Sequence, residues 1–162
     1  MVDYYLHCAN GRKNKMIHAH PLLAYRAMFA TAEQEMCIFT GDRDKAYQRD
    51  MLAGAVEFLA RPGRYLRLAC QCPACDINNC EIVQGILQAV GRLGRVTVHR
   101  ADRYKDLAYL MIADRRAYCF DGGGRAEINY GNPAAAARWQ RDFDHITEQS
   151  PVVIDDFGAG VQ

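Results

Sequence analysis

The chain has 162 residues, of which 50% are hydrophobic and 24% are charged, and its formal net charge is +1. This composition is typical of one globular domain that buries a core without disulfide bridges, and it excludes a disordered chain. The small net charge argues against a partner that is attracted electrostatically to the whole surface. The small net charge does not exclude a local basic patch, because seven basic and three acidic residues fall between Arg92 and Arg116.

The amino-terminal residues 1–5 carry neither the basic region nor the apolar region of a secretion signal. The sequence also contains no apolar run that approaches the roughly 20 residues needed to span a bilayer. We therefore expect a cytoplasmic protein without a membrane partner. Its seven cysteines are then expected to be free thiols, since disulfides are rare in a reducing cytosol.

Hydrophobic periodicity predicts helices that alternate with strands over the first hundred residues. Pro21 suits the first turn of a helix, and Gly94 suits the end of one. In chain order, the predicted elements are a helix at 21–34, a strand at 35–40, a helix at 44–60, a strand at 64–70, a helix at 79–93 and a strand at 95–99.

A run of three strands and one helix is predicted for the remaining sequence. The strands at 107–113 and 116–120 are joined by a tight turn at Asp114-Arg115, and an edge strand follows at 125–130. The last helix begins after Asn132, a favoured capping residue, and covers 133–149.

Strands that are connected through helices predict parallel pairing with right-handed crossovers. The later strands add an antiparallel element. We therefore predict a three-layer α/β/α sandwich around a mixed, mostly parallel sheet. The whole chain 1–162 is expected to form one domain, with a core at about 21–150 and short tails.

The order of these elements resembles one half of the phospholipase D superfamily. Three sequence segments carry the resemblance: residues 111–120, Asn129-Tyr130-Gly131-Asn132-Pro133, and Arg141-Asp142-Phe143-Asp144-His145-Ile146. The match spans most of residues 21–150. It implies a single-copy domain with the fold of that superfamily.

Active members of the superfamily carry the motif His, one residue, Lys, four residues, Asp, in which the His attacks phosphorus and the Lys holds phosphate oxygens. Aligning the motif on Asp114 places Leu107 at the His position and Tyr109 at the Lys position. Leucine has no nucleophilic atom, and a phenol is neutral at pH 7. His99 and Lys105 lie six residues apart and cannot supply the pair on one strand face.

The resemblance therefore implies a degenerate, non-catalytic binding or regulatory module. In active members two halves meet face to face, so a chain with one copy is expected to form a homodimer through an apolar patch around a two-fold axis. The sequence does not specify the ligand. A protein partner, a nucleic acid and a residual enzymatic activity all remain open.

The segment 70–80 contains four cysteines, and three interpretations apply to it. The thiols can form a zinc or iron–sulfur site, because thiolates suit tetrahedral coordination. A redox dithiol is the second interpretation. The third, which we favour, is a set of inert thiols without any cofactor, since buried cysteine behaves as a small hydrophobe. The residues concerned are Cys70, Cys72, Cys75 and Cys80.

The basic residues around the degenerate strand form the second candidate site. Arg100, Arg103 and Lys105 flank Tyr104, and Arg115 follows the strand. Basic side chains interleaved with an aromatic ring can hold a nucleic-acid backbone or a phosphate and stack a base. The simpler interpretation, which we favour here, is a set of solvated loop charges.

Overall fold

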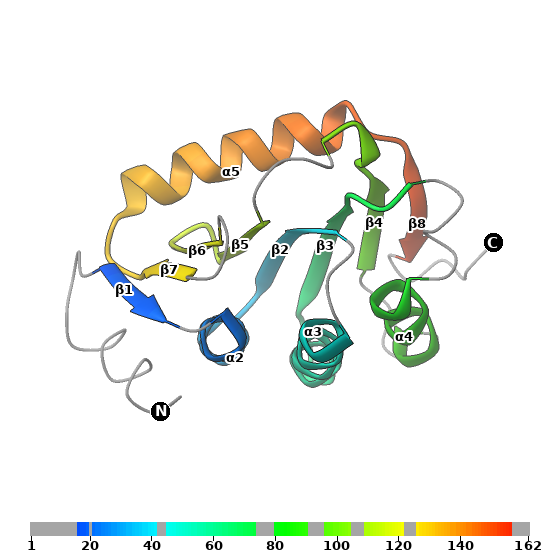
Figure 1. Ribbon diagram of the computed structural model, residues 1–162, viewed down its shortest axis with the longest axis horizontal. Coiled ribbons are helices and arrows are strands. Elements are labelled where there is room, and N and C mark those ends of the chain that lie inside the picture. Colours follow the sequence, from blue (N-terminus) through cyan, green and yellow to red (C-terminus); the bar gives the residue numbers. More distant parts are fainter. Residues whose placement is uncertain are drawn as a thin grey trace.

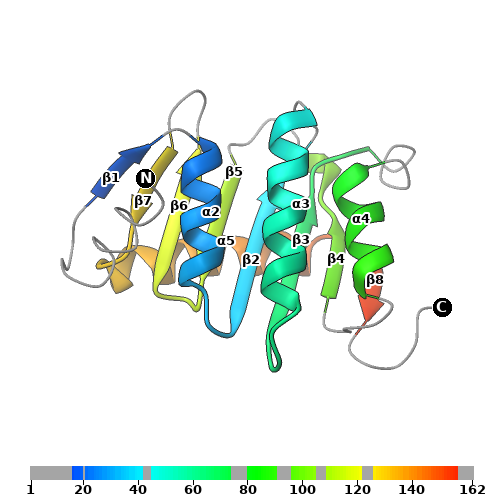
Figure 2. The ribbon, with the colours of Figure 1, turned by 90° about the horizontal axis from the view of Figure 1, so that it is seen from below.

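The computed structural model describes residues 16–19, 21–41, 45–73, 80–90, 96–104, 109–121 and 126–156. An eight-stranded sheet lies between two helical layers, with α2, α3 and α4 on one face and α5 on the other (Figures 1 and 2). The predicted α/β/α sandwich is confirmed. None of the helices in these ranges is long and apolar enough to cross a membrane.

In chain order, the elements are β1 (Met16–Ala19), α2 (Pro21–Thr31), β2 (Glu35–Thr40), α3 (Lys45–Leu59), β3 (Tyr65–Cys70), α4 (Glu81–Val90), β4 (Val96–Arg100), the 3-10 helix η2 (Asp102–Tyr104), β5 (Tyr109–Ala113), β6 (Ala117–Asp121), β7 (Ala126–Asn129), α5 (Pro133–Glu148) and β8 (Val152–Asp156).

The strand order is β1-β7-β6-β5-β2-β3-β4-β8. Strands β2, β3 and β4 are parallel, whereas the other five neighbouring pairs of described strands are antiparallel. The sheet is mixed, as predicted, but the expectation of mostly parallel pairing was wrong. Parallel pairing requires a helical crossover, and only α3 and α4 connect neighbouring strands in this way.

Two described strands lie outside the predicted core at 21–150. β1 pairs with β7, so β7 is not the edge strand that the sequence predicted, and β8 pairs with β4 at the opposite end of the sheet. Both strands are short, and their partners are distant in the sequence, so local periodicity gives no signal for them. Val152 and Val153 on β8 are exposed.

The pleat of the central strands divides the core between the two helical layers. Met36 and Ile38 of β2 face α2, α3 and α4, while Cys37 and Phe39 alternate with them and pack toward α5. All four are nearly completely buried. Complete burial of an apolar side chain of this size stabilises the fold by about 1.5–3 kcal/mol.

The turn between β5 and β6 holds the antiparallel half of the sheet to the parallel half. Asp114 and Arg115 have φ values of 52° and 59°, as in the tight turns that favour hairpins. The Asp114 carboxylate accepts hydrogen bonds from the backbone N–H groups of Glu33, Gln34 and Glu35, at 2.7, 2.8 and 2.9 Å. The turn is thereby fixed to the loop that leads into β2.

An ion-pair network around the buried carboxylate of Glu35 continues from this turn to α5. Glu35 is buried and lies 3.3 Å from Arg115 Nε and 3.6 Å from Arg67 Nη1. Arg67 also donates to Asp144 on α5 at 2.8 Å. Because a buried carboxylate without a cationic partner is strongly destabilising, these contacts keep the turn, β3 and α5 together.

We predict that Asp114→Asn destabilises the protein by about 1–3 kcal/mol, because an amide has only one acceptor oxygen for three N–H donors. Asparagine tolerates positive φ, so the backbone of the turn is kept. Arg116→Ala, in the same turn and exposed, is the matched control and should change stability by less than about 0.5 kcal/mol. Urea unfolding measures both. Equal stability of Asp114→Asn and the wild type would show that the three bonds do not hold the sheet together.

Candidate functional site at the carboxyl edge of the sheet

The carboxyl ends of β2, β3 and β4 meet at one edge of the sheet. Thr40 pairs with Cys70, and Cys70 pairs with Arg100. The antiparallel register of β5 with β2 continues this row to Tyr109, which pairs with Asp121 of β6. Since this edge is where open α/β sheets usually bind ligands, the row is the natural place for a site.

The structure separates the residues of the predicted degenerate motif. Tyr109 is half-buried at the carboxyl edge, whereas Asp114 lies at the opposite end of β5, in the turn described above. Leu107 lies outside the described residues. His99 belongs to β4, where its Nδ1 lies 3.1 Å from the carbonyl oxygen of Ser150, and Lys105 is also outside the described residues.

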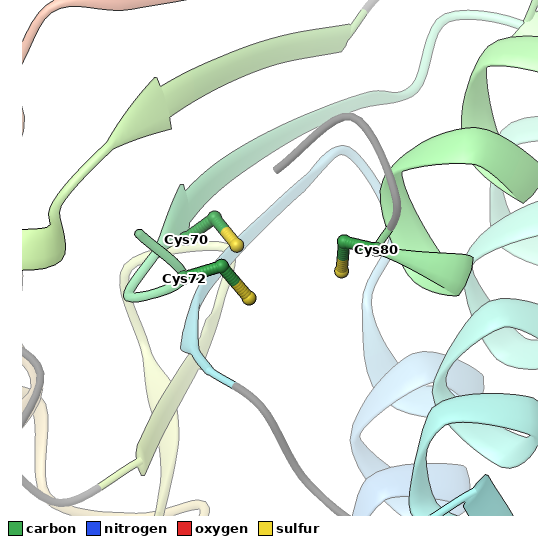
Figure 3. Close-up of side chains that lie close together, drawn as sticks. All are labelled: Cys70, Cys72 and Cys80. Carbon is green, nitrogen blue, oxygen red and sulfur yellow. The ribbon is translucent and has the colours of Figure 1, made fainter. Parts of the chain in front are cut away.

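Three of the four predicted metal ligands come together at this edge (Figure 3). Cys70 ends β3, Cys72 follows in the adjoining segment, and Cys80 directly precedes α4. Their sulfur atoms all lie within 4.8 Å of one another, so the triad is able to hold a metal ion. Cys75, the fourth predicted ligand, lies outside the described residues.

The contacts within the triad shift the pKa values of Cys80 and Cys70 in opposite directions. Hydrogen bonds from Cys70 and Cys72 lower the pKa of the Cys80 thiol, and the backbone N–H groups of Val83 and Ile82 act in the same direction. Hydrogen bonds with Cys72 and Cys80, followed by burial, raise the pKa of the Cys70 thiol. The first turn of α4 thus stabilises a thiolate, as a helix amino terminus does for any anion.

Cys70 lies between two unsatisfied polar neighbours in the row. Thr40 Oγ1 and Arg100 Nε are buried, and neither has a hydrogen-bond partner among the described residues. Arg100 Nε is 3.7 Å from Asp102 Oδ1, which is an ion-pair distance and too long for a hydrogen bond. Native proteins usually satisfy such atoms, so the surroundings of Cys70 have a hydrogen-bonding capacity that a ligand or water can use.

A buried tyrosine–aspartate pair lies at the same edge. Tyr25 of α2 donates to the carboxylate of Asp121 at 2.7 Å, and both side chains are buried. The two residues are 96 positions apart, so nothing local in the sequence indicates that they meet.

The predicted basic site is divided between the two edges of the sheet. Arg100 is the last residue of β4, and the exposed Arg103 follows it in η2. The Arg103 guanidinium is 5.4 Å from the centre of the Tyr104 ring. Arg115 lies in the β5–β6 turn at the other edge, where it pairs with Glu35. One continuous contact surface therefore cannot be built from all of these residues.

Cys37, on the α5 face, fits the interpretation of an inert thiol. It is buried, and its Sγ lies 3.3 Å from Glu35 Oε1. Burial, followed by the negative charge of Glu35, raises the pKa of Cys37 far above its ordinary value. The side chain is protonated at neutral pH and serves packing, in contrast to the triad at the carboxyl edge.

Neither a family model nor a curated protein matches this chain. Among solved structures, it is similar to Nuc of Salmonella typhimurium, a phospholipase D family member, with a TM-score of 0.62, 7% identity, and coverage of 86% of this chain and 98% of that chain. The fold is phospholipase D-like. At this identity the similarity shows the fold alone.

The chain is also similar to TrmBL2, an archaeal chromatin protein whose structure shows a novel mode of DNA binding. The TM-score is 0.61 at 13% identity, and the match covers 87% of this chain and 52% of that chain. This chain therefore spans about half of TrmBL2.

Proposed function

We propose that this chain is a non-catalytic binding or regulatory module built on a phospholipase D-like fold. The observation that supports the proposal is a tyrosine, Tyr109, at the carboxyl edge, where aligning the superfamily motif on Asp114 expects lysine. The sequence places Leu107 at the position of the nucleophilic histidine. A leucine side chain supplies no nucleophile for phosphorus at the histidine position, and a phenol does not carry the positive charge with which lysine holds phosphate oxygens.

The one motif residue that remains, Asp114, supports the same proposal. Its carboxylate accepts hydrogen bonds from three backbone N–H groups at the amino edge of the sheet. This structural role accounts for an aspartate at that position without any catalytic role.

We predict that the purified protein does not hydrolyse bis(p-nitrophenyl) phosphate or plasmid DNA above the rate in buffer. The release of nitrophenolate and the conversion of supercoiled DNA measure the two reactions. Hydrolysis that co-elutes with the protein and is abolished by Tyr109→Phe, but not by the control Tyr104→Phe, would contradict the proposal.

We also propose that the module is a homodimer. The supporting argument is that the chain contains one phospholipase D-like copy, whereas active members of the superfamily bring two together. In the simplest arrangement, the carboxyl edge of one protomer faces the carboxyl edge of a second copy of this chain across a two-fold axis.

Size-exclusion chromatography with light scattering should therefore give a mass of twice 18.3 kDa. The mass is expected to stay constant on dilution through the micromolar range, because a specific dimer interface holds at these concentrations. A single species of 18.3 kDa would contradict the dimer.

A nucleic acid is the second candidate ligand, for two reasons. Arg103 is exposed beside the Tyr104 ring and shares the carboxyl edge with Arg100, so a cation and an aromatic ring lie together. In addition, TrmBL2, which has a similar fold, binds DNA. Cations that contact phosphate and aromatic rings that stack on bases are the usual elements of such a surface.

If this candidate is right, Arg103→Ala weakens binding of a fluorescent DNA duplex. It should also reduce the steepness of the plot of log association constant against log salt concentration by about 1. Arg138→Ala, an exposed arginine on α5, is the matched control and should leave binding unchanged. Fluorescence anisotropy at several salt concentrations measures both variants. Absence of binding at low salt, or equal losses in the two variants, would exclude nucleic acid at this edge.

A further inference from the structure

We propose that Cys70, Cys72 and Cys80 bind one zinc ion that joins the end of β3 to the start of α4. The proposal concerns a different group of residues from the motif on β5. It stands or falls separately from the absence of phosphodiesterase activity.

The positions of the three sulfur atoms fit a single ion. They lie within 4.8 Å of one another, and in Figure 3 Cys70 and Cys72 approach from the strand side while Cys80 approaches from the helix side. Tetrahedral zinc with bonds of about 2.3 Å holds its sulfurs roughly 3.8 Å apart. Closing the triad around zinc therefore needs a movement of about 1 Å or less at each sulfur.

The backbone around the triad holds these positions. Cys70 is paired on both sides, with β2 and with β4, and its carbonyl oxygen accepts the N–H of Ala101 at 2.7 Å. The N–H of Gln71 donates to the carbonyl oxygen of Thr40 at 2.7 Å, which fixes the path to Cys72. Cys80 is held by α4, because its carbonyl oxygen accepts the N–H of Gln84 at 2.9 Å.

The surroundings also suit the charge of a zinc–thiolate complex. Three thiolates and one Zn²⁺ carry a net charge of −1, and the amino end of α4 directs N–H groups toward Cys80. Thr40 Oγ1 and Arg100 Nε, in the positions that flank Cys70, are buried without hydrogen-bond partners among the described residues. In metal sites, the atoms that bind the metal commonly accept hydrogen bonds from neighbouring groups, and the Thr40 hydroxyl and the Arg100 guanidinium can donate such bonds to the ligating sulfurs.

The donor set selects the kind of metal. The cluster consists of sulfur ligands only, which favour zinc over Mg²⁺ or Ca²⁺. An iron–sulfur cluster must fit several irons and sulfides between its cysteines, whereas three sulfurs within 4.8 Å surround a single point. A disulfide is the competing state, but it would join two of the thiols and leave the third alone.

The first experiment is metal analysis by plasma mass spectrometry of the full chain purified without chelator. We expect about one zinc per chain in the wild type and less than about 0.2 in Cys80→Ser. Serine is a favoured helix cap, so this variant removes the sulfur and keeps the start of α4. Cys119→Ala, a buried thiol outside the triad, is the matched control and should retain the zinc.

Thermal unfolding then tests whether zinc links the strand and the helix. A strong chelator should lower the Tm of the wild type to that of Cys80→Ser and leave the variant unchanged. Cys72→Ala provides a second variant if Cys80→Ser does not fold. Wild-type protein with less than about 0.2 zinc per chain, equal zinc in wild type and both variants, an iron-containing cluster, or a Tm difference that persists in chelator would each overturn the proposal.

Discussion

The structure depends on the seam between β2 and β5, where the sheet changes from parallel to antiparallel. The Asp114 carboxylate closes this seam by accepting three backbone N–H groups from the segment that enters β2, and Glu35 extends the contact to Arg67 and Arg115. These bonds lie at the amino edge, but they set the register of β5. The same register places Tyr109 beside the end of β2 at the opposite edge, so the geometry of the candidate site follows from the seam.

We propose that the binding groups of the carboxyl edge belong to other elements than the strand that carries the superfamily motif. β5 presents a phenol, whereas the end of β3 and the start of α4 present three thiols close to the helix amino terminus. We therefore regard the fold as a scaffold whose binding edge has a different donor set, in keeping with the general rule that one fold supports many functions.

The sequence predicted the elements whose determinants are local. The strand Glu35–Thr40 has the predicted bounds, and α5 begins after Asn132, whose side chain accepts the N–H of Ala135 as a helix cap. β1 and β8 depend on pairing with distant strands, so a four-residue or five-residue pattern could not indicate them. The cysteines were visible as a group, but the approach of Cys80 to Cys70 and Cys72 depends on how α4 packs beside α3 into the core on this face of the sheet. The division of the basic residues between the two edges likewise follows from the direction of β5, which the sequence does not specify.

Anomalous diffraction at the zinc absorption edge, from crystals of protein purified without chelator, tests this description of the carboxyl edge most directly. Our account predicts one anomalous peak at about 2.3 Å from the sulfur atoms of Cys70, Cys72 and Cys80. The same crystals should show no metal or covalent phosphate beside Tyr109. A triad without a peak, closed by a disulfide or by thiol hydrogen bonds alone, would contradict the account.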